Sequence, residues 1–220
     1  STDAIDTEIQ KFTKEELSEA FSMTYSQNGQ MLAVFTFNSD RIPGKTFVYN
    51  GSASALAGAH VWFELQSGVT DAPWRVNAIV KAYGKILCGD SVDGRIGYLD
   101  KNTYDEYGEE IFQQVATAPF SNNGGTIFAG EFEATFGAGV GLTTGQGSNP
   151  VVRLDFSDDG ANTWSSEYCR SIGKIGEYGH RAIWHRMGRF PDQRVMRLTK
   201  TDPVKGDLIR LTASPESGSQ

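Results

Sequence analysis

The sequence predicts an all-β protein, with one short N-terminal helix, antiparallel β-propeller-like blades and then a β-sandwich. The 220 residues include 25 glycines and 7 prolines, a balance that suits many tight turns between short strands. Hydrophobic residues make up 39% and aromatic residues 11%, which is enough for a core without disulfide or metal support. Apolar runs are short and bracketed by turn residues, as at residues 31–37 (MLAVFTF), which is typical of strands.

The predicted helix covers residues 14–21 and begins at a capping box. Thr13 and Glu16 have the Thr-x-x-Glu spacing, so the Thr13 hydroxyl can accept from the Glu16 backbone while the Glu16 side chain returns a bond. Leu17 and Phe21 lie four residues apart, on one face of this helix.

Two sets of strands follow the helix, and they resemble each other. Residues 44–50 (GKTFVYN) match residues 94–100 (GRIGYLD), and residues 28–32 match residues 83–87. Units of four strands in about 50 residues have the size of a propeller blade. Two blades cannot close a ring, so further blades lie outside these residues or the fold is an open meander. The strands are expected at residues 31–37, 46–50 and 60–66, then at 75–81, 85–89, 95–99 and 110–115, with a hairpin turn at Asp93-Gly94.

A second domain is expected to begin near Thr117, where the strands become longer. Its strands are expected at residues 126–136, 151–156, 163–169, 181–187, 194–200 and 207–212, which suggests two packed sheets. The uncharged, glycine-rich residues 137–149 are expected to form a mobile hairpin loop that orders against a partner. The predicted domains are therefore residues 1–117 (blades), 118–214 (sandwich) and 215–220 (frayed tail).

The net charge limits the classes of partner, and the cysteine pattern indicates the compartment in which the chain folds. A formal net charge of −7 argues against wrapping nucleic acid or lying on an anionic membrane. The sequence contains no run of about 18 apolar residues, the length that would predict a membrane-spanning helix. Cys88 and Cys169 lie in no CxxC pattern, and we interpret them as buried thiols of a chain that folds in a reducing compartment.

The sequence predicts no cofactor, metal or catalytic site. Gly137, Gly139 and Gly141 lack the third glycine and the following helix of the dinucleotide fingerprint. His180 and His185 are an odd number of residues apart in a strand-like segment, so they face opposite sides and cannot share a metal. No local motif suggests a Ser-His-Asp or Cys-His set. We therefore expect a protein that is not an enzyme.

Residues 157–164 (SDDGANTW) resemble the Asp-box, Ser-x-Asp-x-Gly-x-Thr-Trp, of sialidases and other β-propellers, with Ala161 at the family's glycine position. We interpret the segment as a structural turn in which Asp159 bonds backbone amides and Trp164 packs beside the strand. A sialidase-like or glycan-binding propeller is the alternative hypothesis, and a generic scaffold with propeller blades is a third. The predicted turn residues are Ser157, Asp159, Gly160 and Trp164.

Residues 157–204 resemble the C-terminal region of the packaged-DNA-stabilisation, or tail-hub, family of short-tailed bacteriophages. The family pattern is a Ser/Thr-x-Asp-Gly turn, then Arg-x-x-Trp-x-Arg-x-Gly-Arg, then a strand ending in Ser/Thr-x-Pro-Val. The matching residues are Asp159-Gly160, then Arg181, Trp184, Arg186, Gly188 and Arg189, then Thr201, Pro203 and Val204. Residues 13–16 and Cys88-Gly89-Asp90 also resemble members, and the resemblance extends over roughly residues 5–213. It implies that the chain is the C-terminal half of a longer protein, which fits a first residue that is not Met.

The resemblance implies a structural virion protein of the phage tail, assembled in the host cytoplasm. Such a tail hub, or head-closure component, helps to retain packaged DNA and links the portal-adaptor ring to the tail needle and tailspikes. Its implied partners are these proteins and other copies of itself in a ring, with no membrane and no sequence-specific nucleic acid. The acidic charge is compatible with this role, because a strongly basic channel would grip DNA that must slide past.

Basic residues of the C-terminal strands form the candidate protein interface. A contact with an acidic neighbouring protein is one interpretation, and solvated strand faces or DNA contact are the alternatives. Trp184 alternates with His185 and is assigned to the core. The candidate interface residues are Arg170, Lys174, Arg186, Arg189, Arg194 and Arg197.

Overall fold

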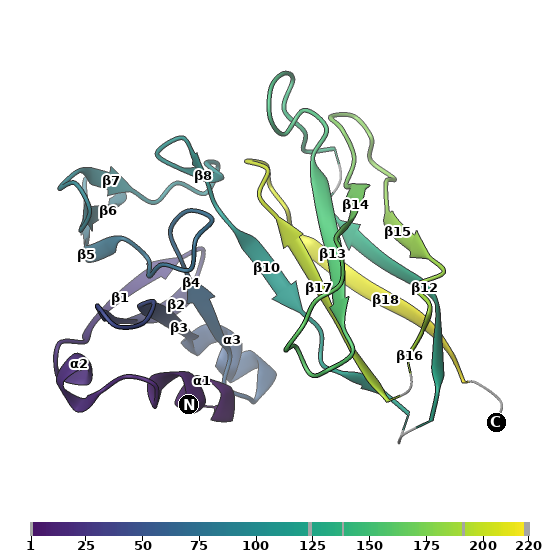
Figure 1. The fold of residues 1–220 in the computed structure, drawn as a ribbon. Helices are drawn as coiled ribbons and strands as arrows, with labels where there is room; N and C mark the ends of the chain where they lie inside the picture. The colour runs from purple at the N-terminus through teal and green to yellow at the C-terminus, as the bar shows by residue number, and fades with distance from the viewer. Residues whose placement is uncertain (1, 123–124, 138, 191, 218–220) are drawn as a thin grey trace. The chain divides into compact units, whose positions relative to one another are not determined.

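The computed structural model confirms the all-β fold and divides it into two compact units, Ser1–Lys101 and Asn102–Gln220 (Figure 1). The structure describes residues 2–122, 125–137, 139–190 and 192–217. The first unit carries two β-meanders, and the second carries two facing sheets.

The first blade is a four-stranded antiparallel sheet whose strands follow chain order. Val34 and Val48, paired across the two central strands, are fully buried. Asn50 caps the helix after the third strand, because its side chain accepts from the backbone N–H of Ala53. The elements are β1 (Phe21–Gln27), β2 (Gln30–Phe37), β3 (Lys45–Asn50), α3 (Gly51–Ala57) and β4 (Trp62–Leu65).

The second blade is a three-stranded sheet of β5 (Val76–Ala82), β6 (Lys85–Asp90) and β7 (Ile96–Tyr98). The sequence predicted a strand at residues 110–115 as the fourth strand of this blade. A strand is present there, β10 (Gln113–Ala116), but its assignment to the blade is wrong because it pairs with a strand of the second unit. The short hairpin of β8 (Asp105–Glu106) and β9 (Glu109–Glu110) precedes it.

The predicted internal repeat corresponds to two equivalent hairpins. Asn28 and Gly29 have φ angles of 50° and 77°, and Tyr83 and Gly84 have φ angles of 53° and 71°. Positive φ at both central positions is the requirement of a type I′ turn, whose twist matches that of the flanking strands. β1–β2 and β5–β6 are therefore the same supersecondary unit used twice.

Two helices precede the first blade, where the sequence predicted one. α1 spans Asp3–Ile9 and α2 spans Lys14–Ser18. The capping box is present: the Thr13 hydroxyl accepts from the backbone N–H of Glu16 at 3.2 Å, and the Glu16 carboxylate accepts from that of Thr13 at 2.7 Å. The helix ends before Phe21, because the backbone of that residue pairs with β2 instead.

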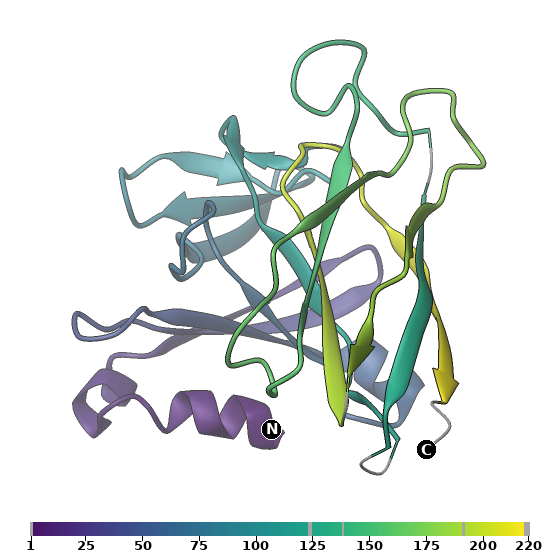
Figure 2. The ribbon, with the colours of Figure 1, turned by 45° about the vertical axis from the view of Figure 1, so that its right-hand side comes forward.

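Both helices lie along one face of the first blade (Figure 2). Phe12, which follows α1, packs against Phe37 with ring centroids 5.6 Å apart. Apolar side chains of both helices complete this cluster, namely Ile5, Ile9 and Leu17. The helices thus remove the apolar face of a sheet from water.

The second unit is a β-sandwich whose two sheets enclose the larger hydrophobic core. Phe132 and Trp184 from one sheet and Leu154 from the other are each 1% exposed or less, as expected for Trp184. One sheet has the order β10-β17-β13-β14 with β11 beside β17, and the other has the order β15-β12-β16 with β18 along β12. The bounds are β11 (Phe120–Ser121), β12 (Ile127–Phe136), β13 (Val151–Ser157), β14 (Tyr168–Ser171), β15 (Ala182–His185), β16 (Arg189–Phe190), β17 (Gln193–Lys200) and β18 (Leu208–Ser217).

Several boundaries differ from those expected. The compact units divide between Lys101 and Asn102, ahead of residue 117, because β10 belongs to the sandwich through its pairing with β17. The strand expected at 163–169 begins only at Tyr168, since the preceding residues form a hydrogen-bonded turn. Cys88 is buried as expected, but Cys169 is exposed.

The last strand extends past the expected end of the sandwich at residue 214, because β18 continues along β12 as far as Ser217. The frayed tail at residues 215–220 stays a prediction. The remaining tail residues, 218–220, lie outside the described residues.

A buried ion pair fixes the second blade to the connection that leads into it. Arg75 and Asp90 approach to 2.6 Å, and their side chains are only 8% and 1% exposed. The backbone N–H of Arg75 donates to the Ser67 hydroxyl at 2.9 Å, and Asp93 is a second, more exposed ionic partner at 3.3 Å. The Asp90 of the family-like Cys88-Gly89-Asp90 segment therefore neutralises a buried guanidinium.

We expect Asp90→Asn to lower the stability of the first unit by about 3 kcal/mol, because it removes the buried carboxylate charge that neutralises the Arg75 guanidinium. Hydrogen exchange of the β6 amides at increasing urea concentration measures this change. Asp40→Asn, at an exposed position, is the control and should shift stability by less than about 0.5 kcal/mol. Equal stability of Asp90→Asn and wild type would show that the ion pair contributes nothing.

Candidate protein-interaction site

The Asp-box segment folds into a turn held by the Asp159 carboxylate. The Thr163 hydroxyl donates to it at 2.6 Å, and the backbone N–H groups of Asn162 and Thr163 donate at 3.0 and 2.9 Å. The Ser157 hydroxyl donates to it at 2.7 Å and accepts from the Ala161 N–H at 2.8 Å. The bonds from Thr163, and then that from Ser157, lower the pKa of Asp159 to about 2 because they favour the ionised form.

Two of the six candidate interface residues form ion pairs with carboxylates of the sandwich itself. Arg194, 2% exposed, donates from Nε and Nη2 to Asp158 at 2.6 and 2.7 Å. Its guanidinium also lies 3.8 Å from the ring centre of Phe156 and 4.6 Å from that of Phe190. It therefore fastens β17 to the Asp-box turn.

Arg197 forms the second internal pair. It makes two hydrogen bonds to Asp155, whose side chain is 6% exposed, and its guanidinium lies 3.6 Å from the ring centre of Trp164. Trp164 thus packs beside β17 as expected. The guanidinium groups of Arg194 and Arg197 are thus bonded within the sandwich, and their role in an interface stays a prediction. Sequence alone could not identify the paired carboxylates.

The four remaining candidates are exposed but do not form one patch. Arg170 lies on β14 and donates to the backbone carbonyls of Cys169 and Ile183 at 2.8 Å each, which joins β14 to β15 of the other sheet. Lys174 lies in the loop that connects these strands. Arg186 and Arg189 lie together beyond the end of β15.

Arg186 occupies a bulge between β15 and β16. Its φ of 57° is in the left-handed region, and its backbone N–H donates to the carbonyl of Gly130, while that of Met187 donates to Ala129. Gly188 follows with φ of 79°. The bulge turns two exposed cations, Arg186 and Arg189, outward along the sheet edge.

The loop that ends the family-like pattern, residues 201–204, has a structural role. The Lys200 side chain is buried, and its ammonium donates to the carbonyls of Asp202 and Val204 at 2.7 and 2.6 Å. Burial lowers the pKa of Lys200 to about 8. The carboxylate of Asp202 accepts from the backbone N–H of Val151. This loop therefore locks β17 to β13, and Val204 is 1% exposed in the core.

The glycine-rich loop packs closely against the neighbouring loop, residues 172–181 (Figure 1). A Cβ at Gly139 would lie 2.7 Å from the ring of Tyr178, and one at Gly141 would lie 2.9 Å from the backbone N of Ile175. Glycine is therefore needed for this close approach. Tyr178 remains 80% exposed at the tip, a feature that sequence analysis missed. Ordering against a partner stays a prediction, and residue 138 lies outside the described residues.

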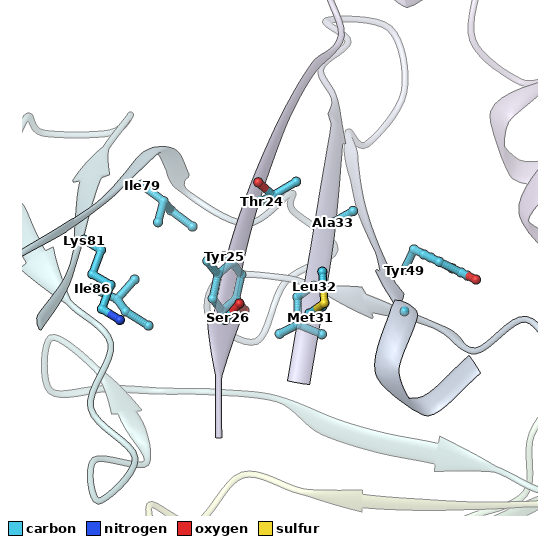
Figure 3. Close-up of a pocket in the computed structure, with 11 residues that line it drawn as sticks. Thr24, Tyr25, Ser26, Met31, Leu32, Ala33, Tyr49, Ile79, Lys81 and Ile86 are labelled. Carbon is cyan, nitrogen blue, oxygen red and sulfur yellow. The ribbon is translucent and has the colours of Figure 1, made fainter. Parts of the chain in front are cut away.

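A cleft of about 510 Å³ lies between the two blades (Figure 3). Tyr25 and Leu32 of the first blade line it, as do Ile79, Lys81 and Ile86 of the second. Burial raises the pKa of Tyr25 to about 12. The walls are mainly apolar.

Within the described part of the chain, no group of three or more His, Cys, Asp or Glu side chains could hold a metal ion. No described helix is both long and apolar enough to span a membrane. His180 bonds the carbonyl of Ser171, and His185 lies 3.2 Å from Glu131, so the two side chains have different partners.

Propeller-type meanders followed by a sandwich, each with internal ion pairs, define an all-β protein of two compact units. Two family models match the chain. One, described as Bacteriophage P22 Gp10, beta-propeller, matches residues 1–104, and the other, Bacteriophage P22 Gp10, beta-sandwich, matches residues 113–216. The chain belongs to the Gp10 family of bacteriophage P22, and hence to the structural proteins of phage tails. No curated protein matches it.

We expect Ala161→Gly to raise the stability of the sandwich by about 1 kcal/mol. Ala161 has a φ of 72°, which is unfavourable for a residue with a Cβ and suits glycine. Urea unfolding, followed by hydrogen exchange of β13 amides, measures the gain. Ala129→Gly, at a strand position, is the control and should be destabilising. A loss of stability in Ala161→Gly would contradict the assignment of strain to this turn.

Proposed function

We propose that the chain is part of a tail hub, a head-closure component that helps to retain packaged DNA. In this role it links the portal-adaptor ring to the tail needle and tailspikes, as one copy in a ring that is assembled in the host cytoplasm. The observation that carries the proposal is the paired match to the propeller and sandwich models of the Gp10 family, in that order along the chain.

The charge and the internal bonding of the chain support a mechanical role. A net charge of −7 disfavours tight binding of DNA, so a closure built from such subunits holds DNA by blocking a channel rather than by gripping phosphates. A ring also requires contacts that close after a fixed number of copies, which rigid subunits favour. The pairs Arg75–Asp90 and Arg194–Asp158 make each unit rigid at places where strands and turns meet.

Arg186 and Arg189, the exposed cations at the bulge, are the candidate interface residues that we propose as the main contact with a neighbouring protein. Arg186 and Arg189 are exposed, adjacent along the edge of β16, and held outward by a fixed backbone. An acidic surface on a neighbouring tail protein would complement them, because opposite charges at the rim of an interface favour the correct encounter. Arg170 and Lys174 lie elsewhere on the sandwich and are proposed only as secondary contacts.

The function is tested by DNA retention. Phage heads packaged without the hub protein should lose their DNA, and the protein, when it is present during packaging, should increase the share of DNA-filled particles, as counted by electron microscopy and nuclease protection. Protein heated to unfold it is the control. Unchanged DNA retention in the presence of folded protein would contradict the proposal. Turnover of a fluorogenic sialoside by that protein would also contradict it and would favour the glycan hypothesis.

The interface is tested by charge reversal. We expect the double variant Arg186→Glu with Arg189→Glu to weaken binding to the assembling tail by about tenfold or more, because it replaces attraction with repulsion. Its stability should not change, since both side chains are exposed. Lys14→Glu, an exposed charge reversal on α2, is the matched control. Equal assembly of the double variant and wild type would remove this edge from the interface.

A further inference from the structure

Two hairpins of the chain have the same type of turn and opposite charges. We call residues 81–86, where β5 turns into β6, the basic hairpin, and residues 105–110, which include β8 and β9, the acidic hairpin. Each turns at a Tyr-Gly pair with positive φ, of 53° and 71° at Tyr83-Gly84 and of 57° and 87° at Tyr107-Gly108. Positive φ at both central positions defines a type I′ turn, so the two hairpins share a backbone and differ in their side chains.

The basic hairpin carries a lysine on each face of its ribbon. Lys81 lies opposite Ile86, and Lys85 lies opposite Ala82, so the two lysines project from opposite faces. Both lysines are exposed. The sequence contains no Asp or Glu from residue 72 to residue 89, so this hairpin is locally positive in a chain whose net charge is −7.

The tip of the basic hairpin also exposes an aromatic ring. Tyr83 is 95% exposed, although a positive φ is less favourable for tyrosine than for Asn28 at the equivalent position of the first blade. Lys85 is held beside this tip, because its ammonium lies 3.8 Å from the ring centre of Tyr98. Tyrosine is among the residues that most often anchor protein interfaces. The tip therefore combines an exposed aromatic ring with positive charge.

The acidic hairpin places carboxylates directly opposite carboxylates. Asp105 lies opposite Glu110, and Glu106 lies opposite Glu109, so each face of the ribbon carries one such pair. Like charges directly opposite each other destabilise a pair of strands. The sequence from residue 102 to residue 152 contains no Lys, Arg or His that could relieve this repulsion locally. The acidic hairpin is therefore suited to a cationic partner.

Protein side chains fit the acidic hairpin better than a metal ion does. Glu109 and Glu110 are exposed, and the bond that Glu110 accepts from the Gln146 amide brings no positive charge. In the segments that the structure describes, no three acidic, His or Cys side chains are grouped to hold a metal ion. Lysine side chains can reach exposed carboxylates on both faces of a ribbon without such a group.

We propose that the basic hairpin of one copy docks on the acidic hairpin of a second copy. The charges are complementary on both faces of the two ribbons, and the Tyr83 ring supplies an aromatic anchor. The hairpins are different surfaces, one in each compact unit, so the contact is heterologous and can lead from copy to copy around a ring. The inference rests on the proposed function in naming a contact that builds the ring.

A zero-length cross-link tests the contact without altering the protein. A carbodiimide joins an amine directly to a carboxylate that it touches, and mass spectrometry identifies the two peptides. The natural protein is prepared as an equal mixture of copies with normal and with heavy nitrogen. We expect cross-links of mixed isotope composition between Lys81 or Lys85 and the carboxylates of residues 105–110. Lys14, exposed on α2, is the control and should not link to the acidic hairpin.

Charge exchange measures the same contact. Lys81→Glu with Lys85→Glu should weaken association of the copies by at least about tenfold, as measured by sedimentation, because the hairpins then repel. Glu109→Lys with Glu110→Lys should do the same. A mixture of the two double variants should associate again, since each supplies the charge that the other requires. Lys14→Glu is the control and should associate as wild type does.

The outcomes separate the inference from the proposed function. Cross-links within single copies only, or no cross-links between the hairpins, overturn the inference, and so does a mixture of folded double variants that fails to associate. Loss of the cross-links when duplex DNA is added would assign the basic hairpin to phosphates and also overturn it. Cross-linked copies that have no effect on DNA retention contradict the proposed function but leave the contact between copies established.

Discussion

The first blade has apolar side chains on both of its faces, and other elements must keep both faces from water. The helices α1 and α2 exist where a cover is needed, and the second blade covers the remaining face of the first. Edge-to-edge pairing contributes nothing to this cover, because it satisfies backbone groups and leaves the side chains of both faces exposed. The stacking of faces is thus the contact from which the propeller architecture derives.

The sandwich meets the same requirement by a different route. Its two sheets cover each other, and two arginine–carboxylate pairs hold the central strand β17 in place. Arg194 fixes β17 to Asp158 of the Asp-box turn, and Arg197 bonds Asp155 on the neighbouring strand β13. Buried pairs of this kind favour one arrangement over others, since a wrongly placed strand would leave a charge unpaired.

Sequence analysis was most accurate where the determining interaction is local. The Thr13–Glu16 capping box, the hairpin repeat and the burial of Trp184 depend on residues close in sequence or on simple alternation. It was wrong where the partner is distant. The strand at residues 113–116 pairs with β17, some 80 residues later, and nothing in its own composition distinguishes it from a fourth strand of the blade. The arginines were assigned to the surface for the same reason, because Asp155 and Asp158 become their partners only after folding.

The bulge at Arg186 has a consequence for how copies of the sandwich meet. An edge strand with regular spacing of N–H and C=O groups is a template on which another chain can add its own strand. At β15–β16 that spacing is interrupted, and a cation is held outward at the interruption. The bulge therefore prevents successive chains from adding strands to this sheet edge. Contacts of the side chains, rather than backbone pairing, then determine which neighbours bind there.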